Sequence, residues 1–404
     1  MQTNISNKFK NNPHVEDAEN IIRSCVHCGF CTATCPTYQL LGDELDGPRG
    51  RIYLIKQVLE GKQVTAKTQT HLDRCLTCRS CETTCPSGVR YGRLVDIGRE
   101  IVEQQVPRGF SEKAQRLLIR KIVPYPKRFA SLLKVGQFFK PVLPVALKDK
   151  IPNVEISHSV KSNEQARKML VLQGCVQSVT TPQTNQAATK ILQKLGIELI
   201  SADKAGCCGA VSHHLSAQEE GLEFMRRNID AWWPYVEQGV EALVITASGC
   251  GSVVKDYGEL LKHDFKYADK ARRISELSKD ISEVLSDEDL PKPTNGSKYK
   301  KVAFQSPCSL QHGQKLSGVV EKILEQAGFE LTEVEDTHLC CGSAGTYSIL
   351  QPKLSKQLQK NKLASLQDAK PDVIATANIG CQMHLASDTE VPVKHWIELL
   401  EAVL

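Results

Sequence analysis

Cysteines carry the clearest chemical signal in this chain of 404 residues, which contains 16 of them. Eight form two copies of the pattern C-x2-C-x2-C-x3-C-P, at residues 25–36 and 75–86. Three thiolates at this spacing wrap one corner of a 4Fe-4S cube, and the fourth, followed by proline, binds the other cube. Zinc sites normally use two C-x2-C pairs set apart, so four cysteines in so short a stretch indicate clusters rather than zinc.

This pattern predicts two 4Fe-4S clusters whose ligand sets cross between the motifs. The first cluster takes Cys25, Cys28, Cys31 and Cys85. The second takes Cys75, Cys78, Cys81 and Cys35. The crossing would tie the two halves of the region together. We expect His27, which lies between the first two cysteines, to cover the first cluster rather than to ligate it.

The other eight cysteines form a second repeated pattern. Each copy has one cysteine after an apolar run, a Cys-Cys-Gly triplet 32 residues later, and one cysteine after a further apolar run. The first copy supplies Cys175, Cys207, Cys208 and Cys250, and the second supplies Cys308, Cys340, Cys341 and Cys381. The apolar runs predict strands and the stretches between them predict helices, so each copy is expected to be a small α/β unit in the order strand, helix, strand, helix, strand. The expected strands are 169–174, 243–246, 302–305 and 373–376, and the expected helices are 186–195, 219–235, 319–327 and 354–366.

Ligands of open α/β sheets bind at the carboxyl ends of strands and at helix N-termini, which is where these cysteines fall. We therefore expect the four thiols of each copy to converge on one crevice. Four thiolates can hold an iron–sulfur cluster or a tetrahedral zinc ion, and an empty dithiol site is the third alternative. A thiol site could use one of four nearby histidines as a proton donor or ligand, but we expect surface or capping residues as the commoner case: His213, His214, His312 and His338.

The elements around these motifs predict a multidomain protein. Apolar residues at helical spacing over 51–60 and 91–105 predict helices beside the ferredoxin motifs. We expect a helical ferredoxin domain with two 4Fe-4S sites, a basic helical connector, and two repeated small α/β cysteine-rich domains. Their predicted ranges are 1–107, 108–165, 166–287 and 288–404, and a linker over 286–300 separates the repeats.

Positive charge gathers in the connector, where residues 108–150 hold eleven Lys or Arg and two acidic residues. Four prolines divide this segment into short helices that also carry apolar side chains. A basic amphipathic segment can lie on an anionic membrane surface, but we favour packing on neighbouring domains or on a partner subunit. Nucleic acid is not expected as a partner, because the charge is local and no nucleic-acid-binding motif accompanies it.

Composition narrows the class of protein further. With 41% hydrophobic and 24% charged residues, the chain is globular, and no run approaches the ~18 apolar residues of a membrane span. The first twenty residues lack the apolar core of a secretory signal, so we expect a cytoplasmic protein, with peripheral contact on the inner face of the cytoplasmic membrane as an extension. No Ser/His/Asp set, HExxH, P-loop or GxGxxG stands out, so we assign no catalytic residue.

The order of motifs resembles the glycolate oxidase iron–sulfur subunits over essentially the whole chain. The resemblance is carried by the two ferredoxin motifs, by Gly47-Pro48-Arg49-Gly50-Arg51 and by the duplicated C-x31-C-C-G element. It implies an electron-transfer subunit of an oxidoreductase complex, with FAD-linked glycolate oxidase subunits as partners in a hetero-oligomer. The FAD subunit would oxidise glycolate to glyoxylate, and this chain would pass the electrons towards a quinone or similar acceptor.

Three alternatives stay open. Lactate or anaerobic glycerol-3-phosphate dehydrogenases have similar iron–sulfur subunits. Heterodisulfide reductases also share the cysteine-rich domain, but their pattern ends in C-x2-C, whereas Ala247 and Asn378 stand three residues before Cys250 and Cys381 here. The missing fifth cysteine weighs against five-thiolate clusters and disulfide cleavage. In the third alternative the repeats are a docking scaffold without redox function.

Overall fold

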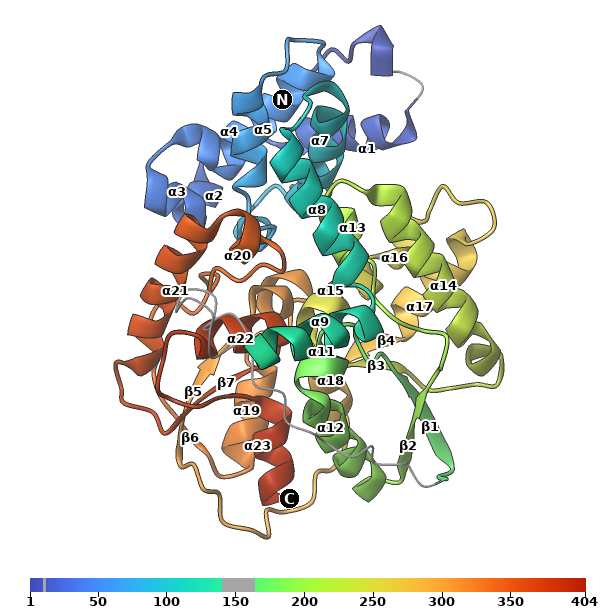
Figure 1. Ribbon diagram of the computed structural model, residues 1–404, viewed down its shortest axis with the longest axis vertical. Coiled ribbons are helices and arrows are strands. Elements are labelled where there is room, and N and C mark those ends of the chain that lie inside the picture. The colour runs from blue at the N-terminus through green and yellow to red at the C-terminus, as the bar shows by residue number, and fades with distance from the viewer. Residues whose placement is uncertain (10–11, 140–163) are drawn as a thin grey trace.

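The computed structural model describes residues 1–9, 12–139 and 164–404. A helical N-terminal region lies above two α/β units that stand side by side (Figure 1). The predicted multidomain architecture is confirmed, while the predicted domain boundaries stay predictions. The N-terminal region contains η1 (Asn7–Phe9), α1 (Pro13–Ser24), α2 (Phe30–Ala33), α3 (Pro36–Leu41), η2 (Glu44–Asp46), α4 (Pro48–Leu59), α5 (Ala66–Asp73), α6 (Ser80–Thr83) and α7 (Tyr91–Gln105).

Helices α4 and α7 form the centre of the N-terminal region. Pro48 stands in the first turn of α4, where its missing N–H costs nothing. The buried side chains of α4 include Ile52, Ile55 and Leu59, and they meet Leu94 and its neighbours at helical spacing on α7 in one apolar core. Both helices were predicted from this spacing, and the core they share holds the two cysteine motifs in place.

Gly50 lets α4 approach η2. A Cβ atom at this position would lie 2.1 Å from the backbone oxygen of Glu44. We therefore expect Gly50→Ala to lower the free energy of unfolding of this region by roughly 1–3 kcal/mol through overpacking. Gly109→Ala is the matched control, because nothing lies within 4 Å of a Cβ there. Chemical denaturation midpoints check this, and equal midpoints for the two variants would contradict it.

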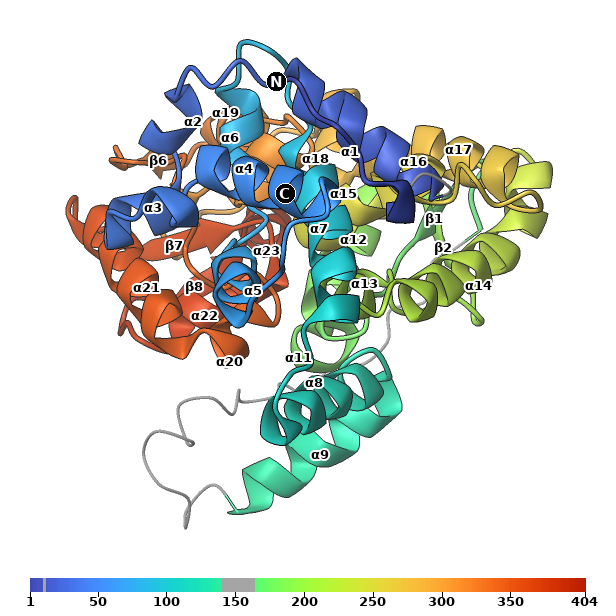
Figure 2. The ribbon, with the colours of Figure 1, turned by 90° about the horizontal axis from the view of Figure 1, so that it is seen from above.

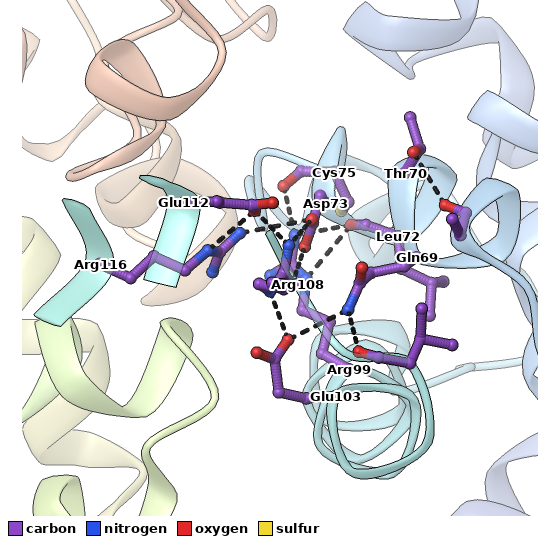
Figure 3. Close-up of polar contacts among 12 residues, drawn as sticks. Gln69, Thr70, Leu72, Asp73, Cys75, Arg99, Glu103, Arg108, Glu112 and Arg116 are labelled. Atoms are coloured by element: carbon purple, nitrogen blue, oxygen red, sulfur yellow. Dashed lines mark hydrogen bonds and ion pairs between the residues drawn. The ribbon is translucent and has the colours of Figure 1, made fainter. Parts of the chain in front are cut away.

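The basic connector begins with α8 (Phe110–Ile122) and α9 (Pro126–Phe139), which project from the body of the molecule (Figure 2). Two of its arginines are structural: the buried Arg108 and Arg116 both pair with Asp73 at the end of α5, at 2.6 and 3.3 Å (Figure 3). The rest of the predicted connector, over 140–163, lies outside the described residues. Among the residues that are described, no helix has the length and apolar character to cross a membrane.

Each cysteine-rich repeat forms a four-stranded parallel sheet, in the orders β2-β1-β3-β4 and β6-β5-β7-β8. The first unit contains β1 (Arg167–Val171), α11 (Gln177–Thr180), α12 (Pro182–Lys194), β2 (Ile197–Ser201), α13 (Ala210–His214), α14 (Gln218–Glu237), β3 (Leu243–Ile245), α15 (Ser248–Lys255), α16 (Tyr257–Leu260), α17 (Ala268–Leu277), β4 (Ser278–Asp280) and α18 (Ile281–Ser286). The second contains β5 (Lys301–Gln305), η4 (Ser309–Gly313), α19 (Val319–Gln326), β6 (Glu330–Leu331), α20 (Tyr347–Leu350), α21 (Pro352–Gln367), β7 (Val373–Thr376), α22 (Ile379–Ala386), β8 (Val393–His395) and α23 (Trp396–Val403). Strands β4 and β8 go beyond the predicted strand–helix–strand–helix–strand order.

One apolar core joins the two repeats. Along β1, Met169 and Val171 face this shared core, while Leu170 faces a separate core of the first repeat. In β5, Val302 and Phe304 face the shared core in the same way. Strands covered on both faces read as continuous apolar runs, which explains why their sequences predicted them. The repeats therefore pack as one body that presents both sets of cysteines.

His395 connects the two repeats and should make the stability of the folded chain depend on pH. The fully buried ring forms a 2.9 Å hydrogen bond from Nε2 to the Thr246 oxygen, and Nδ1 accepts from Ile397 N. Burial lowers the pKa of His395 to about 4. Between this value and the ordinary pKa near 6.5 the unfolded chain binds more protons than the folded chain, so stability falls as pH falls through that window.

We expect this histidine to cost roughly 2 kcal/mol of stability between pH 7 and pH 5. The measurement compares urea unfolding at both pH values in the parent and in His395→Gln, which removes the titrating group and should flatten the dependence. His263→Gln, at an exposed histidine, should keep the parent's dependence. An unchanged pH dependence in His395→Gln would contradict the assignment.

Candidate functional site

The first ferredoxin site is a hollow near the surface of the N-terminal region. Its lining includes the four cysteines predicted to share a cluster: Cys25, Cys28, Cys31 and Cys85. Burial, with a smaller contribution from Cys25, raises the pKa of the Cys31 thiol to about 11. A metal centre binds cysteines as thiolates and supplies the positive charge that stabilises them, so the donor chemistry fits a cluster. His27 also lines this hollow, as expected for a covering residue.

The second site lies deeper and is lined by the other predicted set, Cys35, Cys75, Cys78 and Cys81. Burial raises the pKa values of the Cys78 and Cys81 thiols well above the ordinary range. The side chains of Arg51 and Arg79 line the same hollow and bring positive charge to it. The structure thus brings together both crossed sets that the spacing predicts. Which cysteine ligates which cluster stays a prediction.

Backbone geometry in both motifs also favours a bound anionic group. His27 and Gly29 have φ angles of 58° and 89°, and at the same positions of the second motif Thr77 and Arg79 have 52° and 60°. Left-handed residues that alternate with ordinary ones turn successive N–H groups inward, a concavity that many iron–sulfur sites use. Thr77 N lies 3.3 Å from Cys75 Sγ, in line with that role. Strained non-glycine residues at equivalent positions of both motifs indicate a functional constraint.

A buried charge network supports the second site, and the sequence patterns did not reveal it. Asp46 is fully buried and accepts from Arg51 at 3.5 Å, from Arg74 at 2.8 Å and lies 3.0 Å from His71 Nδ1. Burial would lower the pKa of Arg51, but Tyr91, Cys75, Cys35 and Asp46 raise it. Arg51 therefore stays charged next to the predicted cluster. The only sequence signal was Gly47-Pro48-Arg49-Gly50-Arg51, which places this arginine on α4.

In the first repeat, Cys175, Cys207, Cys208 and Cys250 converge as predicted. Thiol contacts link Cys207 to Cys175 and Cys208, and Cys208 to Cys250. These contacts lower the pKa of Cys208 and raise those of Cys207 and Cys250. Gly209 follows with a φ of 91°, and a Cβ there would lie 2.6 Å from Gly221 O, so the triplet requires glycine.

The second repeat gathers Cys308, Cys340, Cys341 and Cys381 in the same way. Cys308 Sγ lies 3.9 Å from Cys340 Sγ, and contacts continue through Cys341 to Cys381. At the position of the missing fifth cysteine, Asn378 donates from Nδ2 to Cys381 Sγ at 3.5 Å. Cys308 and Cys78 pack around one small apolar cluster, so this site neighbours the second ferredoxin site.

Two of the histidines differ from expectation. His213 and His312 are buried, at 4% and 8% exposure, so their assignment as surface or capping residues is wrong. His312 Nδ1 lies 2.9 Å from the Thr83 hydroxyl of the ferredoxin region. His312 Nε2 lies 2.9 Å from the backbone oxygen of His338. His213 and His214 turn towards Asp96 on α7. Both histidines lie at junctions with the ferredoxin region, and a pattern within one domain carries no signal of such a contact.

Comparison with known proteins supports the same organisation. A family model for a 4Fe-4S dicluster domain matches residues 21–89, and a cysteine-rich domain model matches 169–255 and 302–386. A crystal structure of a hypothetical protein from Helicobacter pylori is similar in fold, with a TM-score of 0.50 at 11% identity over 98% of this chain and 73% of that chain.

Two relatives match along nearly their whole length. The glycolate oxidase iron–sulfur subunit of Escherichia coli (strain K12) is 56% identical over 100% of this chain and 99% of its own. The probable glycolate oxidase iron–sulfur subunit of Bacillus subtilis (strain 168) is 29% identical over 96% of this chain and 93% of its own. Together with the crossed cysteine sites, these matches establish that the chain belongs to the family of glycolate oxidase iron–sulfur subunits.

Proposed function

We propose that this chain is the electron-transfer subunit of a glycolate-oxidising complex. The observation that carries the proposal is the pair of adjacent hollows, each lined by cysteines from both ferredoxin motifs, with Cys81 lining both hollows. When bound there, 4Fe-4S clusters supply one-electron redox chemistry. Cys25, Cys28, Cys31 and Cys85 would hold one, and Cys75, Cys78, Cys81 and Cys35 the other.

The chain's task in this proposal is to conduct electrons between partners. Oxidation of glycolate to glyoxylate releases two electrons and two protons, which an FAD-bearing partner subunit takes up. This chain then carries the electrons singly towards a quinone or similar acceptor. The first site suits contact with a partner, because Cys28 is exposed and Val26 and Phe30 beside it are 69% and 62% exposed.

The two cysteine-rich sites are proposed to be metal–thiolate centres at the inner end of this route. The packing of Cys78 and Cys308 around one apolar cluster supports a route into the second repeat. Cys175, Cys207, Cys208 and Cys250 would serve the first centre, and Cys308, Cys340, Cys341 and Cys381 the second. An iron–sulfur cluster is the first assignment for each, and zinc is the alternative that iron and zinc analysis decides.

Reconstitution of the complex tests the proposal. The full chain, loaded with iron and sulfide, is combined with FAD-bearing glycolate oxidase subunits, and glycolate-dependent reduction of a quinone analogue is followed. We expect acceptor reduction only when this chain is present. D-lactate and glycerol-3-phosphate serve as parallel donors, and faster turnover with either would transfer the assignment to that substrate. Equal rates of acceptor reduction with and without this chain would refute its electron-transfer role.

We also propose that α8 and α9 contact an anionic membrane surface. Phe110, Leu118 and Phe138 on these helices are 89%, 61% and 79% exposed, and exposed cations accompany them. The cations are Lys113, Lys121, Lys127, Arg128 and Lys134. Apolar side chains interleaved with cations suit the interface of an anionic bilayer. Both helices project from the body of the molecule (Figure 2).

Vesicle sedimentation measures this contact directly. The parent chain should sediment with vesicles that contain phosphatidylglycerol, and less so at high salt. Leu118→Glu combined with Phe138→Glu should reduce the bound fraction several-fold. Phe265→Glu changes an exposed phenylalanine far from these helices in the sequence and should bind like the parent. Unchanged binding by the double variant would exclude this face as the contact.

A further inference from the structure

A group of three metal-binding side chains joins the ferredoxin region to the first cysteine-rich repeat. Asp96 lies on α7, and His213 and His214 end α13, shortly after Cys207-Cys208-Gly209. One ligand atom from each lies within 4.8 Å of the others. His213 Nε2 lies 3.5 Å from Asp96 Oδ2, and His214 Nδ1 lies 3.3 Å from Asp96 Oδ1.

These separations are long for charge-assisted hydrogen bonds, which are about 2.7–2.9 Å. They run to different oxygens of Asp96, and one ligand atom from each of the three residues lies within 4.8 Å of the others. Small side-chain adjustments would bring these atoms to the spacing of roughly 3.3 Å between ligands on a tetrahedral ion with bonds of about 2.0–2.1 Å, the zinc–nitrogen length. His213 is only 4% exposed, and neither of its ring nitrogens has a hydrogen-bond partner among the residues that the structure describes. An unsatisfied buried imidazole is costly, and a metal ion would satisfy it.

The charges around this group favour a cation. Glu100, a second acidic side chain, follows Asp96 by one helical turn on α7. Arg99 lies 4.0 Å from Asp96 Oδ1, but its guanidinium donates to the oxygens of Leu72 and Cys75. Gln218 donates to the Asp96 carbonyl and braces α7 against α14.

In two other histidine–carboxylate groups of the chain, lysine or arginine side chains already pair with the carboxylate. Asp17, beside His14 and His263, is paired with Lys262 at 2.5 Å and with Arg93 at 3.4 Å. Asp46, beside His71, is paired with two arginines. Side-chain cations already neutralise both groups, whereas at Asp96 the two imidazoles are the close partners.

We propose that Asp96, His213 and His214 bind a divalent transition-metal ion, zinc in the first instance, that clamps α13 to α7. Imidazole and carboxylate ligands suit zinc. Because α13 follows the Cys-Cys-Gly triplet, the clamp would fix that thiol loop against the ferredoxin region. The site uses none of the cysteines of the proposed cluster sites, and the proposal does not depend on the proposed function.

X-ray absorption at the zinc edge tests the clamp in the full chain with its clusters in place. After incubation with zinc alone and removal of excess metal, the parent should show a shell of nitrogen and oxygen at about 2.0–2.1 Å, in contrast to about 2.3 Å for sulfur. His213→Ala and Asp96→Asn should each bind one zinc fewer per chain, with iron content unchanged. His263→Ala, from the group neutralised by lysine and arginine, should match the parent.

Equal zinc content in all four proteins would overturn the proposal, as would a shell of sulfur alone in the parent. The spectrum of the parent decides the question even where a variant loses iron. A second measurement separates binding from a purely structural ion pair: added zinc should raise the thermal midpoint of the parent and leave that of Asp96→Asn unchanged. An equal rise in both would also overturn the clamp.

Discussion

Cys85→Ser is expected to remove the same 4Fe-4S cluster as Cys28→Ser, although the two cysteines belong to different motifs. Both line the first hollow together with Cys25 and Cys31. Each variant should lose about four iron atoms per chain and the same paramagnetic resonance signal. Glycolate-dependent acceptor reduction should fall to background in both variants, because the loss of one cluster interrupts electron transfer from the flavin to the acceptor.

Cys35→Ser is the matched comparison, since it also changes the last cysteine of a motif. Its sulfur lies with Cys75, Cys78 and Cys81, so it should remove the other signal and leave the first. Loss of the same signal in Cys35→Ser and Cys28→Ser would show that each motif binds its own cluster. Full acceptor-coupled turnover in any of these variants would contradict the conducting role itself.

Asp46→Ala should cause the largest loss of stability in the ferredoxin region. It removes the carboxylate that neutralises Arg51, which is 1% exposed, and leaves that guanidinium with Thr37 and the His71 oxygen as uncharged partners. Removing one member of a buried ion pair costs about 3–5 kcal/mol, since the remaining charge stays buried. The iron content of the second cluster should fall in parallel, because Arg51 lines that site.

Glu44→Ala supplies the control for this change. Glu44 pairs with Arg49 at 2.7 Å, but this pair is partly exposed: the side chain of Glu44 is 42% exposed and that of Arg49 is 34% exposed. Exposed pairs contribute about 0–1 kcal/mol, so this variant should unfold at nearly the parent's denaturant concentration. Similar midpoints for Asp46→Ala and Glu44→Ala would show that the buried network does not stabilise the region.

The sequence predicted most of the architecture because short-range spacing encodes it. The C-x2-C-x2-C-x3-C-P motifs place three sulfurs on one loop, and continuous apolar runs mark strands that are covered on both faces. Strands β4 and β8 escaped prediction because they are three residues long and contain lysine in the middle. Strand pairing with β3 and β7 defines them, and pairing is a long-range property.

The site residues that were missed depend on contacts between distant segments. Asp46 lies 25 residues from His71, and His213 meets Asp96 from another domain. Buried polar groups must be satisfied by partners, but a single sequence does not say which partner the fold supplies. The prediction of a surface role for His213 followed the commonest case for histidine, and tertiary packing overrode it.

The central claim is that electrons from glycolate reach metal centres on this chain. The most direct measurement is anaerobic: glycolate is added to the chain assembled with the proposed FAD-bearing partners, and cluster reduction is followed by visible bleaching and electron paramagnetic resonance. Rapid bleaching, with signals from both ferredoxin sites, is the predicted result. If dithionite reduces the clusters but glycolate does not, this chain is not the electron acceptor for glycolate oxidation.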